Sequence, residues 1–128
     1  MKYLIDTDVV IDYLRGEIKL DKESIEVGAG ISIITLGELV YGAYKSVNPQ
    51  RSIDQTLGFI KESEIQIMDL NQEIIYHFGQ LKAELEKLGQ RIEDFDLLIG
   101  ATAKVLNLIL VTRNLKHFKR IKGLKIAD

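Results

Sequence analysis

KYLIDTDVVIDYLRG, residues 2–16, is the stretch that decides the fold. Its first part, Lys2–Ile5, has the short apolar run of a buried strand, and Asp6 stands at the end of that strand. Thr7 then opens a helical pattern of apolar residues that stops at Gly16. A strand that runs directly into a helix, with an acid at the junction, predicts the first unit of an α/β fold with its chemistry at the strand end.

The remainder of the chain continues this alternation. Apolar runs predict further strands at 31–34, 65–68, 108–111 and 124–127. Helical patterns predict a weak helix around Ser24, a helix that Thr35 caps with Glu38 as its capping-box partner, and helices over about 49–60, 71–88 and 94–106. Strands that alternate with helices predict a parallel sheet covered on both faces.

Length and composition limit the class of protein. A chain of 128 residues predicts one domain, residues 1–128. With 46% hydrophobic and 28% charged residues it has the composition of a folded globule. The absence of Cys excludes a disulfide scaffold and a thiolate metal site. There is no recognisable signal peptide and no apolar run of the ~18–20 residues that a membrane helix needs, so we expect a cytoplasmic protein without membrane association.

The charges are unevenly distributed. Six cations and no acid lie between Arg113 and Lys125, and five acids lie between Glu84 and Asp96. A metal-dependent enzyme that acts on a polyanion needs such an arrangement. From charge alone, a solvated surface with uneven charge is the more ordinary explanation.

Three acids that are distant in sequence are expected at one edge of the sheet. Asp6 follows the first strand, Glu38 lies one turn into the helix after the second, and Asp96 opens the helix before the fourth. In open α/β sheets this carboxyl edge is where ligands bind. The positive end of a helix dipole explains Asp8, Asp94 or Asp96 singly. It does not explain Asp6 and Glu38 as well, and acids gathered together repel one another unless a cation lies among them.

Four segments resemble motifs of the PIN domain, as found in VapC-type toxin ribonucleases. They are LIDTDVVIDYLRG (4–16), ISIITLGELVYGA (31–43), DFDLLIGATA (94–103) and LVTRNLKHF (110–118). They keep the family's order and span nearly the whole chain. The resemblance implies a PIN-like three-layer α/β sandwich, with a five-stranded parallel sheet and helices on both faces.

The resemblance also implies a site. Asp6, Glu38 and Asp96 match the family's catalytic, metal-binding acids. Where the family supplies a further acid after the fourth strand, this chain has Asn114, which could bind the metal through water. Asp94 is the alternative supplementary ligand. Oxygen donors of this kind suit Mg²⁺ or Mn²⁺.

Substrate contacts are expected beside the acids. Thr7 and Thr112 match polar positions of the family and could orient water or phosphate. The candidates for binding an RNA backbone are three cations, Arg15, Arg113 and Lys116.

The function predicted is a Mg²⁺- or Mn²⁺-dependent endoribonuclease, the toxin of a pair with a small antitoxin, acting as a homodimer. A PIN-domain nuclease of RNA processing without an antitoxin is the main alternative. Two less favoured classes are a haloacid-dehalogenase-type phosphatase, through Asp6 and Asp8, and a phosphoacceptor receiver domain, through Asp69 and Thr112. The receiver leaves Glu38 and Asp96 without a role.

Overall fold

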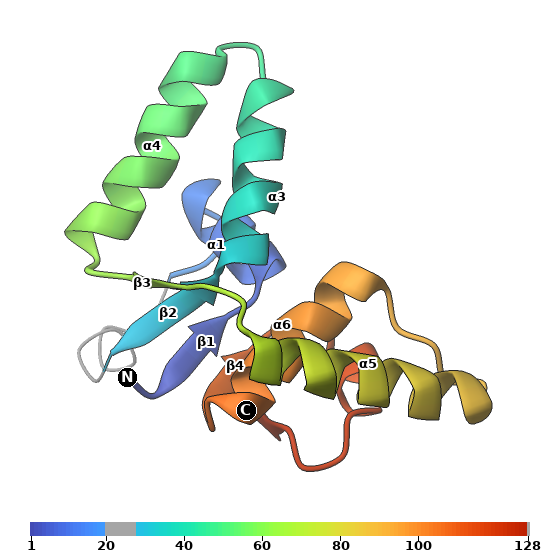
Figure 1. Ribbon diagram of the computed structural model, residues 1–128. Helices are drawn as coiled ribbons and strands as arrows, with labels where there is room; N and C mark the ends of the chain where they lie inside the picture. Colours follow the sequence, from blue (N-terminus) through green and yellow to red (C-terminus); the bar gives the residue numbers. More distant parts are fainter. Residues whose placement is uncertain (20–27, 128) are drawn as a thin grey trace.

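The computed structural model describes residues 1–19 and 28–127 (Figure 1). In chain order the elements are β1 (Tyr3–Ile5), α1 (Thr7–Leu14), β2 (Ala29–Ser32), α3 (Ile33–Tyr44), α4 (Pro49–Glu62), β3 (Gln66–Met68), α5 (Gln72–Lys87), α6 (Asp94–Val105), β4 (Ile109–Val111), α7 (Leu115–Phe118) and β5 (Lys125–Ile126). The weak helix expected around Ser24 lies outside the described residues. No helix among the described residues is both long enough and apolar enough to cross a membrane.

The five strands form one sheet in the order β3-β2-β1-β4-β5, and every pairing is parallel. The predicted five-stranded parallel sheet is therefore confirmed. From β1 the chain builds outward through β2 and β3, then returns to the other side of β1 for β4 and β5. The direction of strand order reverses between β1 and β4, and such a reversal opens a crevice at the carboxyl ends of the two strands.

Each face of the sheet carries its own hydrophobic cluster. On one face, Leu4 and Leu110 pack with residues of α5 and α6, among them Ile74 and Leu97. On the other face, residues of α1, α3 and α4 pack against the sheet, and the cluster comprises Ile5, Val9, Val10, Ala29, Ile31, Leu39, Phe59, Ile60 and Ile65. The predicted three-layer arrangement, with helices on both faces, is confirmed.

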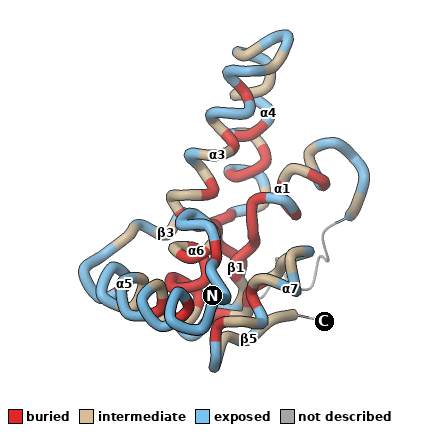
Figure 2. Tube along the Cα trace, turned by 90° about the vertical axis from the view of Figure 1, so that its right-hand side faces the viewer, coloured by how far each residue is buried: buried red, intermediate tan, exposed pale blue. Residues whose placement is uncertain are grey.

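Helices α3 and α4 form a hairpin that stands out beyond the sheet (Figure 1). Asn48 accepts a hydrogen bond from the backbone N–H of Arg51, and Pro49 occupies the first turn of α4, as predicted from the sequence. Buried positions lie along the hairpin where the two helices face each other, and exposed positions lie outside (Figure 2). The hairpin therefore adds a wall above the carboxyl edge of the sheet.

The predicted boundary between the second strand and its helix was wrong. The strand ends at Ser32, and the helix begins at Ile33 instead of after Thr35. The Ser32 side chain accepts a 3.0 Å hydrogen bond from the Ile34 N–H, which fixes Ser32 as the N-cap, so the proposed capping box of Thr35 with Glu38 does not form. The β-branched residues Ile33 and Ile34 favour a strand locally, but the cap overrides that preference. The short helix α7 was not predicted.

Candidate active site

Asp6 and Thr112 leave adjacent strands side by side. Ile5 of β1 pairs with Val111 of β4, so the next residue on each strand emerges at the crevice. The Asp6 N–H donates to the Val111 carbonyl at 2.9 Å. Thr112 Oγ1 donates to Asp6 Oδ2 at 2.7 Å, and the Thr7 N–H donates to Asp6 Oδ1 at 2.8 Å. Each carboxylate oxygen of Asp6 is thus held by one hydrogen bond.

Asp6 as a whole residue is only 3% exposed. Burial raises its pKa above the ordinary value of 3.8, and the charges of Asp8 and Glu38 raise it further. The hydrogen bonds from Thr112 and Thr7 oppose this effect but do not cancel it. Asp6 is therefore a carboxylate whose negative charge is poorly compensated by the protein alone.

Thr7, the residue after Asp6, forms hydrogen bonds with both Glu38 and the buried Thr35. Thr7 Oγ1 lies 2.8 Å from Glu38 Oε1 and 2.9 Å from Thr35 Oγ1, and Thr35 is completely buried. An ionised carboxylate can only accept a hydrogen bond, so Thr7 donates its single hydroxyl proton to Glu38. Thr35 then donates to Thr7. The result is a fixed orientation for one oxygen of Glu38.

Asp96 lies in the first turn of α6 and completes the group of acids. Its pKa is raised from 3.8 to about 6, first by burial and then by the negative charges of Asp6, Glu38 and Asp8. The helix dipole at this position favours the ionised form, but burial and like charge outweigh it. Raised pKa values of this kind mark acids held together against their mutual repulsion, which is common at functional sites.

The donor set fits a hard divalent cation. All its ligating atoms are carboxylate or hydroxyl oxygens, which Mg²⁺ and Mn²⁺ prefer. A cation would also offset the burial and the like-charge repulsion that together raise the Asp96 pKa. Among residues 1–19 and 28–127, however, no group of three or more His, Asp or Glu side chains is arranged so that it could hold a metal ion. The acids lie within electrostatic range of one another.

The two candidates for a fourth metal ligand, Asp94 and Asn114, have different partners in the structure. Asp94 forms a 2.9 Å ion pair with Lys82 of α5, so its carboxylate is directed to that helix. The Asn114 N–H donates to Thr112 Oγ1 at 3.0 Å, and its side-chain amide lies 2.9 Å from His117 Nδ1. Asn114 is thereby tied to the threonine that binds Asp6.

Asp8 is the site residue that the sequence did not assign. It lies one residue after Thr7 on α1, is exposed, and its charge raises the pKa of both Asp6 and Asp96. From the sequence alone, the helix dipole was a sufficient explanation for an acid in the first turn. The only signal for more was its spacing of two residues from Asp6.

The three cations predicted to bind substrate have different surroundings. Arg113 forms an ion pair with the buried Asp12 of α1, and this contact fastens the segment after β4 to α1. Arg15 lines a cavity of about 460 Å³ together with Asp8, Asp12, Arg113 and Asn114. Lys116 is exposed on α7.

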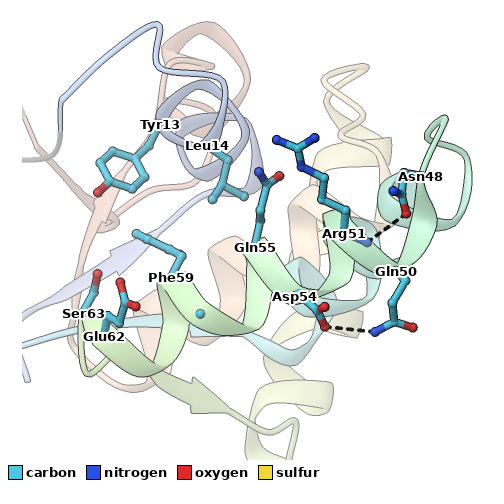
Figure 3. Close-up of a pocket in the computed structure, with 11 residues that line it drawn as sticks. Tyr13, Leu14, Asn48, Gln50, Arg51, Asp54, Gln55, Phe59, Glu62 and Ser63 are labelled. Carbon is cyan, nitrogen blue, oxygen red and sulfur yellow. Dashed lines mark hydrogen bonds between the residues drawn. The ribbon is translucent and has the colours of Figure 1, made fainter.

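Two larger cavities flank α1. One of about 920 Å³ runs from Thr7, Asp8 and Glu38 along α3. The other, of about 870 Å³, lies between the end of α1 and α4, where Tyr13 and Leu14 face Phe59, Gln55 and Arg51 (Figure 3). Of the three acids predicted to be catalytic, Glu38 lines the first cavity and none lines the second.

Residues 3–124 match the PIN domain family model, and the chain belongs to that family. The chain is 38% identical to the ribonuclease VapC2 of Haemophilus influenzae and 34% identical to the tRNA(fMet)-specific endonuclease VapC of Salmonella typhimurium. Each match covers 100% of this chain and 98% of the relative. The fold superimposes on the crystal structure of DNA-bound VapBC from Salmonella typhimurium with a TM-score of 0.90 at 34% identity, covering 100% of this chain and 98% of the other.

Proposed function

We propose that this chain is a Mg²⁺- or Mn²⁺-dependent endoribonuclease that hydrolyses RNA phosphodiesters. The observation that carries the proposal is the position of Asp6, held by Thr112 and Thr7 at the point where strand order reverses, with Glu38 bonded to the same Thr7. Relatives named as VapC ribonucleases, matched over the full chain, support the same activity.

Each acid has a defined part in this proposal. Asp6 and Asp96 would hold the cation, and Glu38 would hold it or orient the attacking water. Thr7 fixes Oε1 of Glu38, so Oε2 is the oxygen that would accept a proton from the water. Thr112 keeps the Asp6 carboxylate aligned with the crevice. A bound divalent ion would supply Lewis acidity, drawing charge from the phosphate and lowering the pKa of nearby water.

The decisive experiment compares wild type with Asp6→Asn on cellular RNA in Mn²⁺, in Mg²⁺ and after chelation. Wild type should produce discrete fragments with 5′-phosphate and 3′-hydroxyl ends, and both Asp6→Asn and chelation should abolish them. Circular dichroism should show that Asp6→Asn retains the fold, because an amide fills the same volume. Full cleavage by a folded Asp6→Asn would refute the assignment.

We further propose that the protein is a toxin held inactive by a small antitoxin, and that it works on RNA in the cytoplasm. We also propose that its 128 residues form one domain and that two copies of the chain form a homodimer. The structural relatives from Salmonella typhimurium and Rickettsia felis are VapBC complexes, which supports a protein partner. Co-expression with the product of a short adjacent reading frame should give a stable complex that does not cleave RNA. If no such reading frame exists, the alternative of an RNA-processing nuclease without an antitoxin is favoured.

A further inference from the structure

The cavity beside the acids follows one face of α3. It begins at Thr7, Asp8 and Glu38 and extends past Tyr41 to Lys45. Positions 34, 37, 41 and 45 recur at intervals of three or four residues, so they share one side of the helix. At about 1.5 Å per residue they span roughly 16 Å. Asp8 and Glu38 therefore stand at one end of a trough long enough for a short run of nucleotides.

Phe95 of α6 also lines this trough. It lies between Asp94 and Asp96 in the first turn of α6, and 56% of its surface is exposed. The aromatic pair found among the described residues joins Tyr13 to Phe59, so Phe95 has no ring partner there. A phenyl ring left in water beside charged residues contributes little to folding. Its flat face is available to a ligand at the acids.

Two glycines line the trough and add no side chain to it. Gly37 and Gly42 lie inside α3, where glycine is less favourable than alanine. A Cβ at either position would meet no atom within 4 Å. Neither glycine is therefore required by a close contact among the described residues. Gly37 lines the same cavity as Phe95 and Glu38, so a methyl group there would occupy space that is now open.

Cations lie on the rim. The Nζ atom of Lys45 lies 4.8 Å from the centre of the Tyr41 ring, and this contact places the positive charge of Lys45 at the far end of the trough. Arg15 of α1 lines the same cavity. A hollow with an exposed aromatic ring, two glycines in its lining and cations at its edge has the features of a site that stacks bases and follows a phosphate backbone.

We propose that this trough holds unpaired nucleotides of the RNA, with the Phe95 ring stacked on a base next to the bond that is cut and Lys45 bound to the backbone. The inference rests on the proposed ribonuclease function and extends it by naming residues that position the substrate. It assigns the trough to single-stranded nucleic acid in preference to a protein segment, because the cations at its edge complement a polyanion.

The test uses two decamers with the same number of phosphates. One is 5′-fluorescein-labelled oligouridylate, and the other is a fluorescein-labelled abasic deoxyribose decamer that has no bases. Binding is measured by fluorescence anisotropy in Mg²⁺, with every protein carrying Asp6→Asn to prevent cleavage. Phe95→Ala and Phe95→Leu should weaken oligouridylate binding roughly tenfold or more, and Phe95→Trp should not. None of the three should change binding of the abasic decamer, whereas Lys45→Ala should weaken both.

Glycine variants supply a control that a purely structural role would not reproduce. Gly37→Ala should raise the melting temperature, because it improves helix propensity, and yet weaken oligouridylate binding. Gly79→Ala, in an exposed part of α5 where a Cβ also meets no atom within 4 Å, should raise the melting temperature without affecting binding. If Gly37→Ala raises the melting temperature but weakens oligouridylate binding, and Gly79→Ala raises the melting temperature only, the trough is identified as the binding surface.

Equal affinity of the parent protein for the two decamers, or unchanged oligouridylate binding by Phe95→Ala, would overturn the inference. Loss of both decamers in Phe95→Ala would also overturn it, because that result indicates a damaged site instead of lost stacking. These outcomes are independent of the proposed activity. Cleavage of cellular RNA that requires Asp6 keeps the ribonuclease assignment whatever Phe95 does.

Discussion

Thr112 donates a 2.7 Å hydrogen bond to Oδ2 of Asp6, although the two residues are 106 positions apart in the chain. The contact exists because β4 returns to pair with β1 in a register that brings Val111 beside Ile5. Thr112 is therefore the residue through which the last third of the chain fixes the orientation of Asp6, the first acid of the proposed site.

Thr112→Val should destabilise the protein by about 1–3 kcal/mol at pH 7.5, because it removes a hydrogen-bond donor from the buried Asp6 carboxyl group. Thr112→Ser should retain most of the stability, since it keeps the hydroxyl. The Asp6 pKa is already raised by burial and should rise further in the valine variant. The difference between the two variants should therefore shrink as pH falls and Asp6 becomes protonated. Urea denaturation at pH 7.5 and pH 4.5 measures this, and equal stabilities at pH 7.5 would contradict it.

Asp96→Asn should stabilise the metal-free protein at pH 7.5, on the order of 1–2 kcal/mol after allowance for solvent screening. The folded-state pKa of Asp96 is about 6, against 3.8 for its ordinary value, so the folded chain binds this proton more tightly than the unfolded chain. Wild type should be most stable with respect to this group below pH 4 and lose that stability as pH rises to about 6. The asparagine variant should lack this loss.

Thermal unfolding in EDTA between pH 4 and 8 measures this effect of Asp96. Added Mn²⁺ should then reverse the order by stabilising wild type more than the variant. A variant that is less stable than wild type at pH 7.5 without metal would show that Asp96 is not held against repulsion.

Thr35→Val should lower kcat by about 10- to 100-fold with little change in KM. Valine fills the buried space but cannot donate to Thr7, so the hydrogen bond that orients Glu38 is weakened. Thr35→Ser should restore activity, because it returns the hydroxyl while removing a methyl group. If serine is as inactive as valine, Thr35 acts through packing and not through its hydroxyl.

Asn114→Asp should tighten Mn²⁺ binding, measured by isothermal titration calorimetry, because it adds negative charge beside Thr112 and Asp6. Asp94→Asn is the matched control: its carboxylate is paired with Lys82, so neutralising it should leave Mn²⁺ affinity unchanged. Weaker binding in Asp94→Asn together with no effect of Asn114→Asp would show that the fourth ligand comes from α6.

Much of the fold was predictable because its signals are local. The run before Asp6 is apolar with strand character, Asn48-Pro49 marks a helix start, and Asn71 caps a helix with a clear amphipathic period. Where two local signals competed, the predicted boundary was wrong. Ile33 and Ile34 have strand character, but the Ser32 hydroxyl begins the helix before them.

The sequence by itself determined the alternation of strands and helices, and hence that Asp6, Glu38 and Asp96 lie at one edge of a parallel sheet. This was possible because each placement depends on a residue's position within its own element. Only the tertiary structure decided which neighbours the acids have: Thr112 on Asp6, Thr7 on Glu38, and Asp8 as an additional charge. It also directed Asp94 to Lys82 and Arg113 to Asp12. These pairings depend on strand register and helix packing between distant segments, and no local pattern of residues encodes them.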